Sequence, residues 1–359
     1  MSRRLKVGVV GGGVGVAHIG AYQELPDLYE VAAFCDIDAE RAAKVASEKG
    51  IAKPVMRLDD LLALDLDLID VATPSSLHFT HAMQALKAGR NVVVEKPIAA
   101  SLAEVDAFAA AEKETGRRVA PIFQYRFANG LRKFLHLRER GLIGKPYVAT
   151  VETHWRRGAA YYDNPWRGRW KGEVGGSLIT HAIHGHDMLT VAMGPVASVF
   201  GRLATRVNPI ETEDCVAAAL AMKSGALATL SVTLGSDQEI SRLRMVFDGL
   251  VVENNADPYN PGFEPWKFMA PDAPAQKRIE DALADFRGGA ERWVGQFAAM
   301  HQALTENAPL PVTLEDARAA IELLTALYYS DYSGEAVSLP IGRDHPFYRG
   351  WTAAMAEAG

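Results

Sequence analysis

The stretch Gly175–Asp187, GGSLITHAIHGHD, contains three histidines and an aspartate within thirteen residues. An imidazole can bind a metal ion, and it can also give and take a proton near neutral pH. The same residues also occur on the polar side of an ordinary helix. The spacing of the histidines therefore has to decide between a metal site, an acid/base site and a plain helix.

Helical spacing favours acid/base chemistry over a metal centre. One face of a helix over 178–192 would carry Thr180, His184 and Asp187. On that helix His181 lies about 60° from His184, whereas His186 points about 200° away from it. Because the three imidazoles cannot meet at one ion, we predict no metal site.

A glycine-rich turn near the N-terminus is the second stretch whose residues suit a functional site. The apolar run 5–10 is followed by GGGVG, which contains Gly11, Gly13, Val14 and Gly15. Glycines after a strand let the backbone approach a pyrophosphate, which then lies at the positive end of the next helix. The glycine spacing is one residue shorter than the usual dinucleotide pattern, so a tight structural turn explains it as well.

Asp36 favours the nucleotide interpretation. It ends the next apolar run, about 20 residues after the glycines, where a carboxylate can accept hydrogen bonds from ribose hydroxyls. A carboxylate there repels the 2′-phosphate of NADP, and no arginine or serine follows directly, so we predict NAD rather than NADP. Alternatively, Asp36 caps a helix that begins near Asp38, and the two roles are compatible.

The elements that would hold these residues alternate through the first third of the chain. Five short apolar runs are typical of strands buried on both faces: 5–10, 31–35, 68–73, 91–95 and 119–123. Amphipathic segments between them predict helices: 16–24, 39–49, 78–88 and 101–115. The alternation predicts a parallel sheet covered by helices, in a domain over 1–123.

The pattern changes after Phe123 and predicts a second, α+β domain over 124–359. Longer alternating strands are expected at 147–155, 197–205, 215–222, 226–234 and 242–247. Helices are expected at 129–140, about 276–306 and 313–332, and a loop rich in Tyr, Trp and Arg at 156–172. Consecutive strands of this kind form an antiparallel sheet.

The composition predicts a folded protein without a general affinity for nucleic acid or membranes. Of the 359 residues, 48% are hydrophobic. The net charge is -6, whereas nucleic acids and anionic lipids attract positively charged proteins. No apolar run reaches the ~18 residues of a membrane span. The two cysteines, Cys35 and Cys215, lack metal-type or redox-type spacing, which favours a reduced compartment and a cytoplasmic protein.

Further motifs run through nearly the whole chain. They are Asp70-Val71-Ala72-Thr73-Pro74, His78, Glu95-Lys96-Pro97, Gly175-Gly176, His184, Asp187 and Glu315-Asp316-Ala317-Arg318. Together they resemble the glucose-fructose oxidoreductase, inositol dehydrogenase and MocA (Gfo/Idh/MocA) family. The resemblance implies a Rossmann domain and a second domain whose open sheet often joins subunits, hence a homodimer or homotetramer. It also implies hydride transfer between NAD(P) and a hydroxyl-bearing carbon, usually of a sugar or polyol.

The resemblance also implies roles for single residues. Lys96 matches the family's active-site lysine and His184 its catalytic histidine, so we expect His184 to take the hydroxyl proton while Lys96 hydrogen-bonds the same oxygen. Many members have an aspartate where this chain has Thr180, which cannot carry charge. Either His184 and Lys96 suffice, or His181 or Asp187 compensates, or activity is reduced. Asp187 is expected to hold the imidazole of His184 or to be a buried structural carboxylate.

The same motifs supply the rest of the expected cofactor site. Residues expected to join the glycine turn and Asp36 there are Thr73, Pro74, His78, Glu95, Lys96 and Pro97. A cis peptide bond before the proline of Glu-Lys-Pro is frequent in the family and is expected here.

The aromatic, arginine-rich loop suits a carbohydrate. Aromatic faces stack on the C–H faces of a sugar ring, and amides and guanidiniums bind its hydroxyls, although such a loop can also pack two domains together. The arginines would also suit an acidic substrate, such as a sugar acid or nucleotide sugar. The expected substrate-binding residues are Gln124, Arg126, Arg156, Tyr162, Trp166, Arg167, His181 and Asp187.

The sequence therefore predicts an NAD-dependent dehydrogenase of a sugar, inositol or related cyclic polyol. Three alternatives stay open at this point. One is a nucleotide-sugar or amino-sugar oxidoreductase, and another is a regulator that binds the dinucleotide without turnover. The third is a redox lyase or cofactor-recycling oxidoreductase, in which the nucleotide never leaves the protein.

Overall fold

The structure is a computed structural model that describes residues 3–358. The chain divides into two compact units. The first unit contains the chain up to Phe123 together with Trp293–Arg318, and the second contains Gln124–Arg292 and the residues from Ala319 onward. The composition of the sequence changes at the first of these breaks, whereas nothing in it indicates that Trp293–Arg318 belongs to the first unit.

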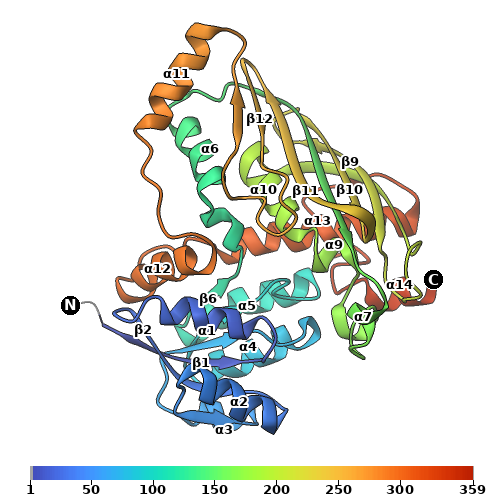
Figure 1. Ribbon diagram of the computed structural model, residues 1–359. Coiled ribbons are helices and arrows are strands. Elements are labelled where there is room, and N and C mark those ends of the chain that lie inside the picture. The colour runs from blue at the N-terminus through green and yellow to red at the C-terminus, as the bar shows by residue number, and fades with distance from the viewer. Residues whose placement is uncertain (1–2, 359) are drawn as a thin grey trace. The chain divides into compact units, whose positions relative to one another are not determined.

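The first unit is built on a six-stranded parallel sheet with the strand order β3-β2-β1-β4-β5-β6 (Figure 1). Its strands are β1 (Leu5–Val10), β2 (Tyr29–Cys35), β3 (Lys53–Val55), β4 (Leu68–Val71), β5 (Asn91–Val94) and β6 (Val119–Pro121). Every residue of β4 is buried, as expected for a strand covered on both faces. The predicted parallel sheet is confirmed, and the short β3 is an addition to it.

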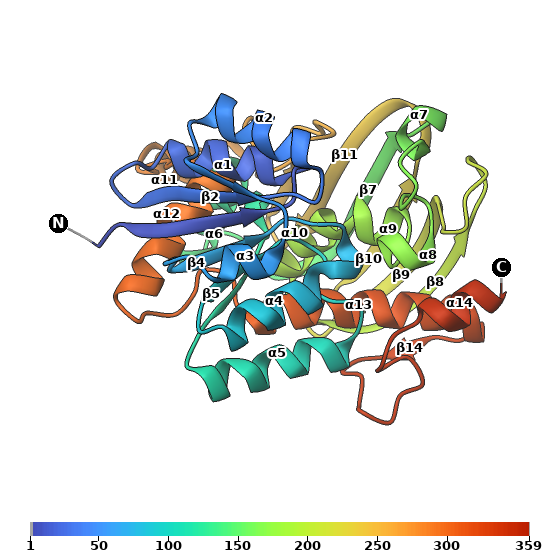
Figure 2. The same ribbon diagram turned by 90° about the horizontal axis from the view of Figure 1, so that it is seen from below.

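The helices of the first unit follow the strands. They are α1 (Gly15–Gln23), α2 (Ala39–Lys49), α3 (Leu58–Leu62), α4 (His78–Lys87), α5 (Leu102–Thr115) and α12 (Arg292–Thr305), with a short 3-10 helix, η1 (Ser75–Leu77). The helices α4 and α5 lie side by side (Figure 2), where the rings of Phe79 and Phe108 meet edge to face.

Helix α12 is fixed to the first unit by aromatic contacts. The ring of Phe297 stacks on that of Tyr22, with the centroids 4.1 Å apart. The hydroxyl of Tyr29 donates a 2.8 Å hydrogen bond to the carbonyl of Phe297. A helix from the last quarter of the sequence thus completes the core of the first unit.

The second unit contains an eight-stranded sheet with the order β13-β12-β11-β7-β10-β9-β8-β14. Its strands are β7 (Pro146–Arg156), β8 (Val196–Ala204), β9 (Cys215–Met222), β10 (Leu227–Thr233), β11 (Gly235–Phe247), β12 (Leu250–Glu253), β13 (Lys267–Met269) and β14 (Val337–Ser338). The strands β7 and β10 pair in parallel, and the other neighbouring pairs are antiparallel. The predicted, mainly antiparallel sheet is confirmed.

The long helices of the second unit pack on one side of this sheet. The helices are α6 (Asn129–Glu139), α7 (Ala159–Tyr162), α8 (Trp170–Glu173), α9 (Ser177–Thr180), α10 (Ile183–Met193), α11 (Ala273–Ala284) and α14 (Thr352–Ala358), with the 3-10 helix η2 (Gln124–Phe127). Helix α13 (Leu314–Ser333) begins in the first unit and continues in the second. Helix α10 contacts β7 and β11, and a Cβ on Gly185 would lie only 3.0 Å from the side chain of Val151.

Two helix predictions are wrong. The expected helix over 178–192 is broken, because α9 ends at Thr180 and α10 begins at Ile183. The Thr180 hydroxyl lies 2.7 Å from the Gly176 carbonyl and 2.6 Å from Nδ1 of His181, and such local bonds compete with regular helix geometry. The expected helix over 276–306 is two helices, separated by a segment that contains Gly288-Gly289.

A buried carboxyl group, that of Glu213, holds the turn that leads into α9. Its oxygens accept hydrogen bonds of 2.9 Å from the N–H groups of Gly176 and Leu178, and of 3.2 Å from the Tyr328 hydroxyl. A Cβ on Gly175 would lie 2.2 Å from that hydroxyl, and one on Gly176 1.9 Å from the Glu213 carbonyl oxygen. The glycine pair is therefore needed for this close approach, and burial raises the pKa of Glu213 to about 7.

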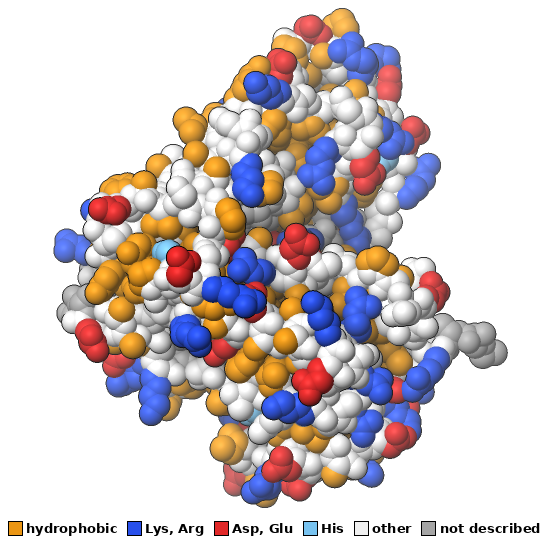
Figure 3. Space-filling view, turned by 180° about the vertical axis from the view of Figure 1, so that it is seen from behind, with side chains coloured by type: hydrophobic (Ala, Val, Ile, Leu, Met, Phe, Trp, Pro, Cys, Tyr) orange, Lys and Arg blue, Asp and Glu red, His pale blue; other side chains and the backbone are white. Residues whose placement is uncertain are grey.

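The surface carries charges of both signs. Figure 3 shows acidic and basic side chains interspersed over one face of the molecule. Among residues 3–358, no helix is both long enough and apolar enough to cross a membrane.

We expect Glu213→Gln to abolish a pH dependence of stability that the parent protein shows. The pKa of Glu213 is raised from 4.5 to about 7 on folding, so the folded state holds the extra proton. The resulting stabilisation is complete below the unfolded pKa and is lost as the pH rises through the folded one. A shift of this size corresponds to roughly 3 kcal/mol.

Urea unfolding between about pH 5 and 8 measures this effect. From the lower to the higher pH, the free energy of unfolding of the parent protein should fall by roughly 2 to 3 kcal/mol relative to that of Glu213→Gln. Glu211→Gln is the matched control, because Glu211 is exposed and pairs with Arg169. A parent-to-variant difference that does not change with pH would contradict the raised pKa.

Candidate active site

The expected cofactor residues of the first unit gather at one edge of its sheet. The glycine turn follows β1, Asp36 follows β2, Thr73-Pro74 follows β4, and Glu95-Lys96-Pro97 follows β5. All these strands are parallel, so their carboxyl ends share one edge. The strand order reverses between β1 and β4, and in open sheets of this type ligands bind beside that switch point.

The glycine turn leaves room for a ligand at the start of α1. Gly11 has φ +108°, and a Cβ there would lie 2.4 Å from the carbonyl oxygen of Ala72. A Cβ on Gly15 would lie 3.1 Å from Val9, so this glycine lets α1 approach β1. Around Gly13, by contrast, no described atom beyond its two chain neighbours lies within 4 Å of the Cβ position. With Val14 partly exposed beside it, the turn fits a pyrophosphate at the helix N-terminus.

Asp36 is held by its own chain. Its carboxylate accepts hydrogen bonds from the N–H of Gly12 at 2.7 Å and from Nε of Arg41 at 2.8 Å. Partial burial would raise the pKa of Asp36, but the hydrogen bonds from Arg41 and two backbone N–H groups outweigh it and lower the pKa. The cap of α2 is Asp38, which accepts from the N–H of Arg41, so the capping alternative for Asp36 is wrong. The ion pair between Asp36 and Arg41 was not predicted from the sequence.

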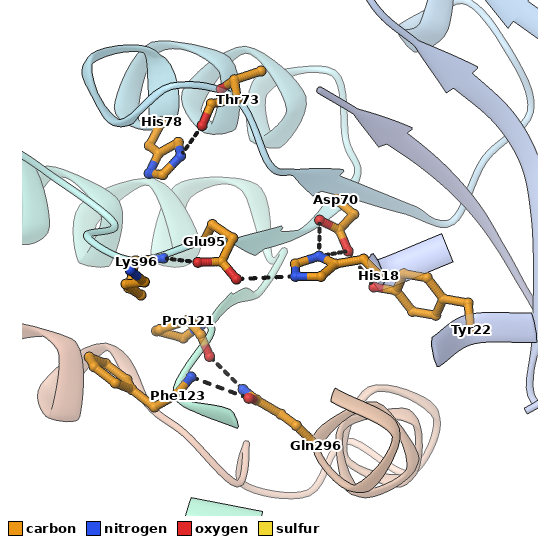
Figure 4. A network of polar contacts seen from close by, with 10 residues as sticks. All are labelled: His18, Tyr22, Asp70, Thr73, His78, Glu95, Lys96, Pro121, Phe123 and Gln296. Atoms are coloured by element: carbon orange, nitrogen blue, oxygen red, sulfur yellow. Dashed lines mark hydrogen bonds and ion pairs between the residues drawn. The ribbon is translucent and has the colours of Figure 1, made fainter. Parts of the chain in front are cut away.

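His78 lies between the loops that follow β4 and β5. Its Nδ1 lies 2.6 Å from the carbonyl oxygen of Pro97. Its Nε2 lies 2.7 Å from the carbonyl oxygen of Thr73 (Figure 4). Burial lowers the pKa of His78 despite these carbonyls. The Lys96–Pro97 bond is cis, as the sequence predicted. A neutral imidazole has one N–H, so His78 donates to one of these carbonyls and only contacts the other. It thus lies between two expected cofactor loops, and any part it has in cofactor binding would act through them.

A buried polar cluster lies directly behind Lys96 (Figure 4). It contains His18 and Tyr22 of α1, Asp70 of β4, and Glu95, whose carboxylate accepts the N–H of Lys96 at 3.0 Å. Sequence reasoning missed His18 as a functional candidate. The signal available was a histidine one turn before a tyrosine in the helix that follows the glycines.

In the second unit, two of the three histidines line one small cavity. His181, between α9 and α10, and His184, in the first turn of α10, face it. Tyr125, Trp155 and Ser241 complete this part of its wall. The ring of His181 meets that of Trp155 edge to face at 5.1 Å, and the ring of His184 lies 4.5 Å from that of Tyr125.

His186 lies away from this cavity. Both of its ring nitrogens are buried without a hydrogen-bond partner among the described residues, and burial lowers its pKa to about 3. His181 and His184 are therefore brought together as an acid/base site requires, while His186 fills the interior of the unit as a neutral ring.

The hydroxyl of Thr180 contacts the Gly176 carbonyl and the His181 ring. If its hydroxyl donates to the Gly176 carbonyl, then His181 Nδ1 donates to the same hydroxyl oxygen, because a hydroxyl carries one hydrogen. This arrangement fixes the tautomer of His181 and leaves its Nε2 as the basic nitrogen.

Asp187 and Arg126 form an ion pair. Both carboxylate oxygens of Asp187 accept from the guanidinium of Arg126, at distances between 2.6 and 3.1 Å. Asp187 is 3% exposed, which supports the structural interpretation of this carboxylate. Gln124, also expected to bind substrate, is buried in η2.

The arginines of the aromatic loop are paired with carboxylates of the same unit. Arg156 pairs with Asp237, and Arg167 lies 3.2 Å from Glu173. The guanidinium of Arg167 also lies over the rings of Tyr161 and Trp166, at 4.0 and 4.4 Å. The loop therefore packs largely on itself.

Two family models match the chain. The model described as "Oxidoreductase family, NAD-binding Rossmann fold" matches residues 5–123. The model described as "GFO/IDH/MocA C-terminal domain" matches residues 131–249. The first match includes Lys96 and the second includes His184. The resemblance noted in the sequence is confirmed.

The chain is similar to individual proteins, some of which align with nearly all of it. The WlbA dehydrogenase from Bordetella pertussis, solved in complex with NADH and UDP-GlcNAcA, is 29% identical, with a TM-score of 0.82 over 95% of this chain and 99% of that chain. The uncharacterized oxidoreductase YrbE from Bacillus subtilis is 25% identical over 94% of this chain and 98% of its own length. Inositol 2-dehydrogenase 3 from Saccharopolyspora erythraea is 33% identical over 40% of this chain and 44% of its own length. The protein is therefore an NAD-dependent oxidoreductase that belongs to the Gfo/Idh/MocA family.

Proposed function

We propose that the protein transfers a hydride between NAD and a hydroxyl-bearing carbon of a sugar, inositol or related cyclic polyol. The observation that carries this proposal is the position of Glu95-Lys96-Pro97, at the same sheet edge as the glycine turn and Asp36. An ammonium group at this edge can donate to a substrate oxygen beside the nicotinamide.

The proposed chemistry divides between three side chains. NAD, when bound, supplies the hydride acceptor. Lys96 donates a hydrogen bond to the substrate oxygen, and His184 takes the proton of the hydroxyl as it becomes a carbonyl. Thr180 cannot take a proton at neutral pH, and its bond to His181 gives it an orienting role instead.

The charges of the aromatic loop favour an uncharged substrate. Each of Arg156, Arg157 and Arg167 already lies beside a carboxylate of the second unit. Recruiting Arg157 or Arg167 for an anionic substrate would compete with a partly buried ion pair, whereas the Arg156 pair is exposed and contributes little. The half-buried rings of Tyr162 and Trp166 and the exposed amide of Asn164 remain for the faces and hydroxyls of a neutral ring.

A nucleotide sugar is the second candidate substrate. The support for it is the Bordetella pertussis dehydrogenase, which was solved with NADH and UDP-GlcNAcA and aligns with nearly the whole chain. The paired arginines argue against it, and the substrate panel described below separates the two candidates.

Self-association is supported by the outer face of the large sheet. Adjacent strands place Val148 beside Leu227, and the same face carries Phe200 on β8. These side chains are 43%, 59% and 41% exposed. Because contiguous apolar surface on a sheet favours association, we propose a homodimer or homotetramer.

The first test measures the absorbance of reduced nicotinamide after the protein is mixed with NAD and a panel of inositols, aldoses, anhydrosugars, sugar acids and nucleotide sugars. We expect turnover with a neutral cyclic substrate. Turnover confined to nucleotide sugars would select the second candidate, and no turnover with any compound would contradict the proposal.

Lys96→Met tests the role of the lysine. We expect kcat to fall by at least about 100-fold while the Kd for NADH changes little, because the lost hydrogen bond acts on the substrate oxygen. Lys87→Met, on the exposed last turn of α4, is the matched control. If NADH binding and turnover disappear together, Lys96 is structural.

Asp36→Ala tests cofactor choice. We expect NAD to bind about tenfold more weakly, because its ribose loses a charged acceptor. NADP should gain affinity, because Arg41 loses its partner and can pair with the 2′-phosphate. Titrations of intrinsic fluorescence measure both. Adding Arg41→Ala should remove the gain for NADP, and a gain that persists would show that Arg41 has no part in it.

A further inference from the structure

We propose that His18 is a positioning residue for Lys96 and acts through the carboxylate of Glu95. The inference rests on the proposed function, since Lys96 is the group that it positions. His18 lies on α1, the helix that begins at the glycine turn, and its side chain is completely buried.

With both carboxyl groups ionised, the contacts of the His18 ring require a doubly protonated imidazole. Nδ1 lies 3.0 Å from both carboxylate oxygens of Asp70, and Nε2 lies 3.1 Å from Oε1 of Glu95 (Figure 4). A neutral imidazole has one N–H, whereas ionised carboxylates only accept. Satisfying both contacts therefore takes an imidazolium between two carboxylates.

The surroundings strengthen this charge pairing. The rings of Trp293 and Phe297 lie 5.4 and 5.5 Å from the ring of His18 and exclude water from it. Burial alone would lower the pKa of His18, but Asp70 and Glu95 outweigh it and raise the pKa to about 10. Without this cation, two ionised carboxylates buried side by side would strongly destabilise the folded protein.

Glu95 transmits the position of His18 to the lysine. One carboxylate oxygen meets His18, and the other accepts the N–H of Lys96 at 3.0 Å. On the far side of the same turn, His78 contacts the carbonyl of Pro97. Side chains thus contact the backbone that presents the Lys96 ammonium from two sides, and the contact through Glu95 leads back to the glycine-turn helix.

Removing the imidazolium should therefore change the ionisation state of the Glu95 carboxyl group. In His18→Gln the glutamine can hydrogen-bond but carries no charge, so protonation of Glu95 is favoured and its bond to the lysine turn is disturbed. Titratable groups that face His18 or Glu95 include Tyr22, Asp70, His78 and Lys96, and Tyr29 lies near Asp70.

The first experiment is independent of activity. In cofactor-free protein labelled with ¹⁵N-histidine, we expect one imidazole, absent from the spectrum of His18→Gln, to stay doubly protonated up to about pH 9. A neutral ring at this position at about pH 8 would overturn the proposal. If His18→Gln does not fold, Glu95→Gln identifies the same ring by shifting its signals.

The second experiment compares His18→Gln with Tyr22→Phe. The hydroxyl of Tyr22 donates to Asp70 at 2.8 Å, so the control removes a hydrogen bond from the same buried cluster without changing the charge beside Glu95. We expect His18→Gln to lower kcat about 10- to 100-fold and to move the acid limb of kcat/KM to higher pH. Tyr22→Phe should keep the parent pH profile. Equal losses in both variants, without a shift of the acid limb, would make His18 merely structural.

Two further measurements separate this proposal from the proposed function. Adding Glu95→Gln to His18→Gln should cause little further loss, because both changes act through one carboxylate. The rate at which acetic anhydride modifies Lys96 in cofactor-free protein should change about threefold or more in His18→Gln but not in Tyr22→Phe. An unchanged rate would overturn the positioning role even if no substrate is turned over, whereas a changed rate without turnover would count against the proposed function alone.

Discussion

Parallel pairing at the centre of the first sheet is the constraint on which the candidate cofactor site depends. Strand β1 pairs in parallel with β2 on one side and β4 on the other, and β5 extends the sheet by one strand. The loops after all four strands therefore leave at the same edge. The glycine turn, Asp36, Thr73 and Lys96 are far apart in the sequence and share this edge because their strands run in the same direction.

The histidines of the second unit are positioned in a different way, by a buried carboxyl group that accepts hydrogen bonds from backbone N–H groups. Glu213 holds the N–H groups of Gly176 and Leu178, and the Gly176 carbonyl in turn contacts the hydroxyl of Thr180. That hydroxyl contacts His181, which lines the cavity together with His184. A single chain of polar contacts thus runs from the core of the unit to the candidate acid/base site.

Local patterns predicted the elements well, and tertiary contacts explain what they missed. Alternation and short apolar runs indicated every long strand, because burial on one or two faces determines which residues a strand accepts. The break in the helix at His181 depends on a threonine hydroxyl that leaves the apolar pattern unchanged. The sequence did not predict the cluster around His18, because its partners, Asp70 and Glu95, lie 52 and 77 residues away.

Buried histidines in this protein show that residue type alone does not assign a role. Burial without a carboxylate lowers the pKa of His186 to about 3, so this ring stays neutral. The same burial at His18 is outweighed by two carboxylates, and the pKa rises to about 10. Neither ring can exchange protons readily near neutral pH. Proton transfer in the proposed reaction therefore falls to the cavity that His184 lines, while His18 serves as a fixed charge that orders the groups behind Lys96.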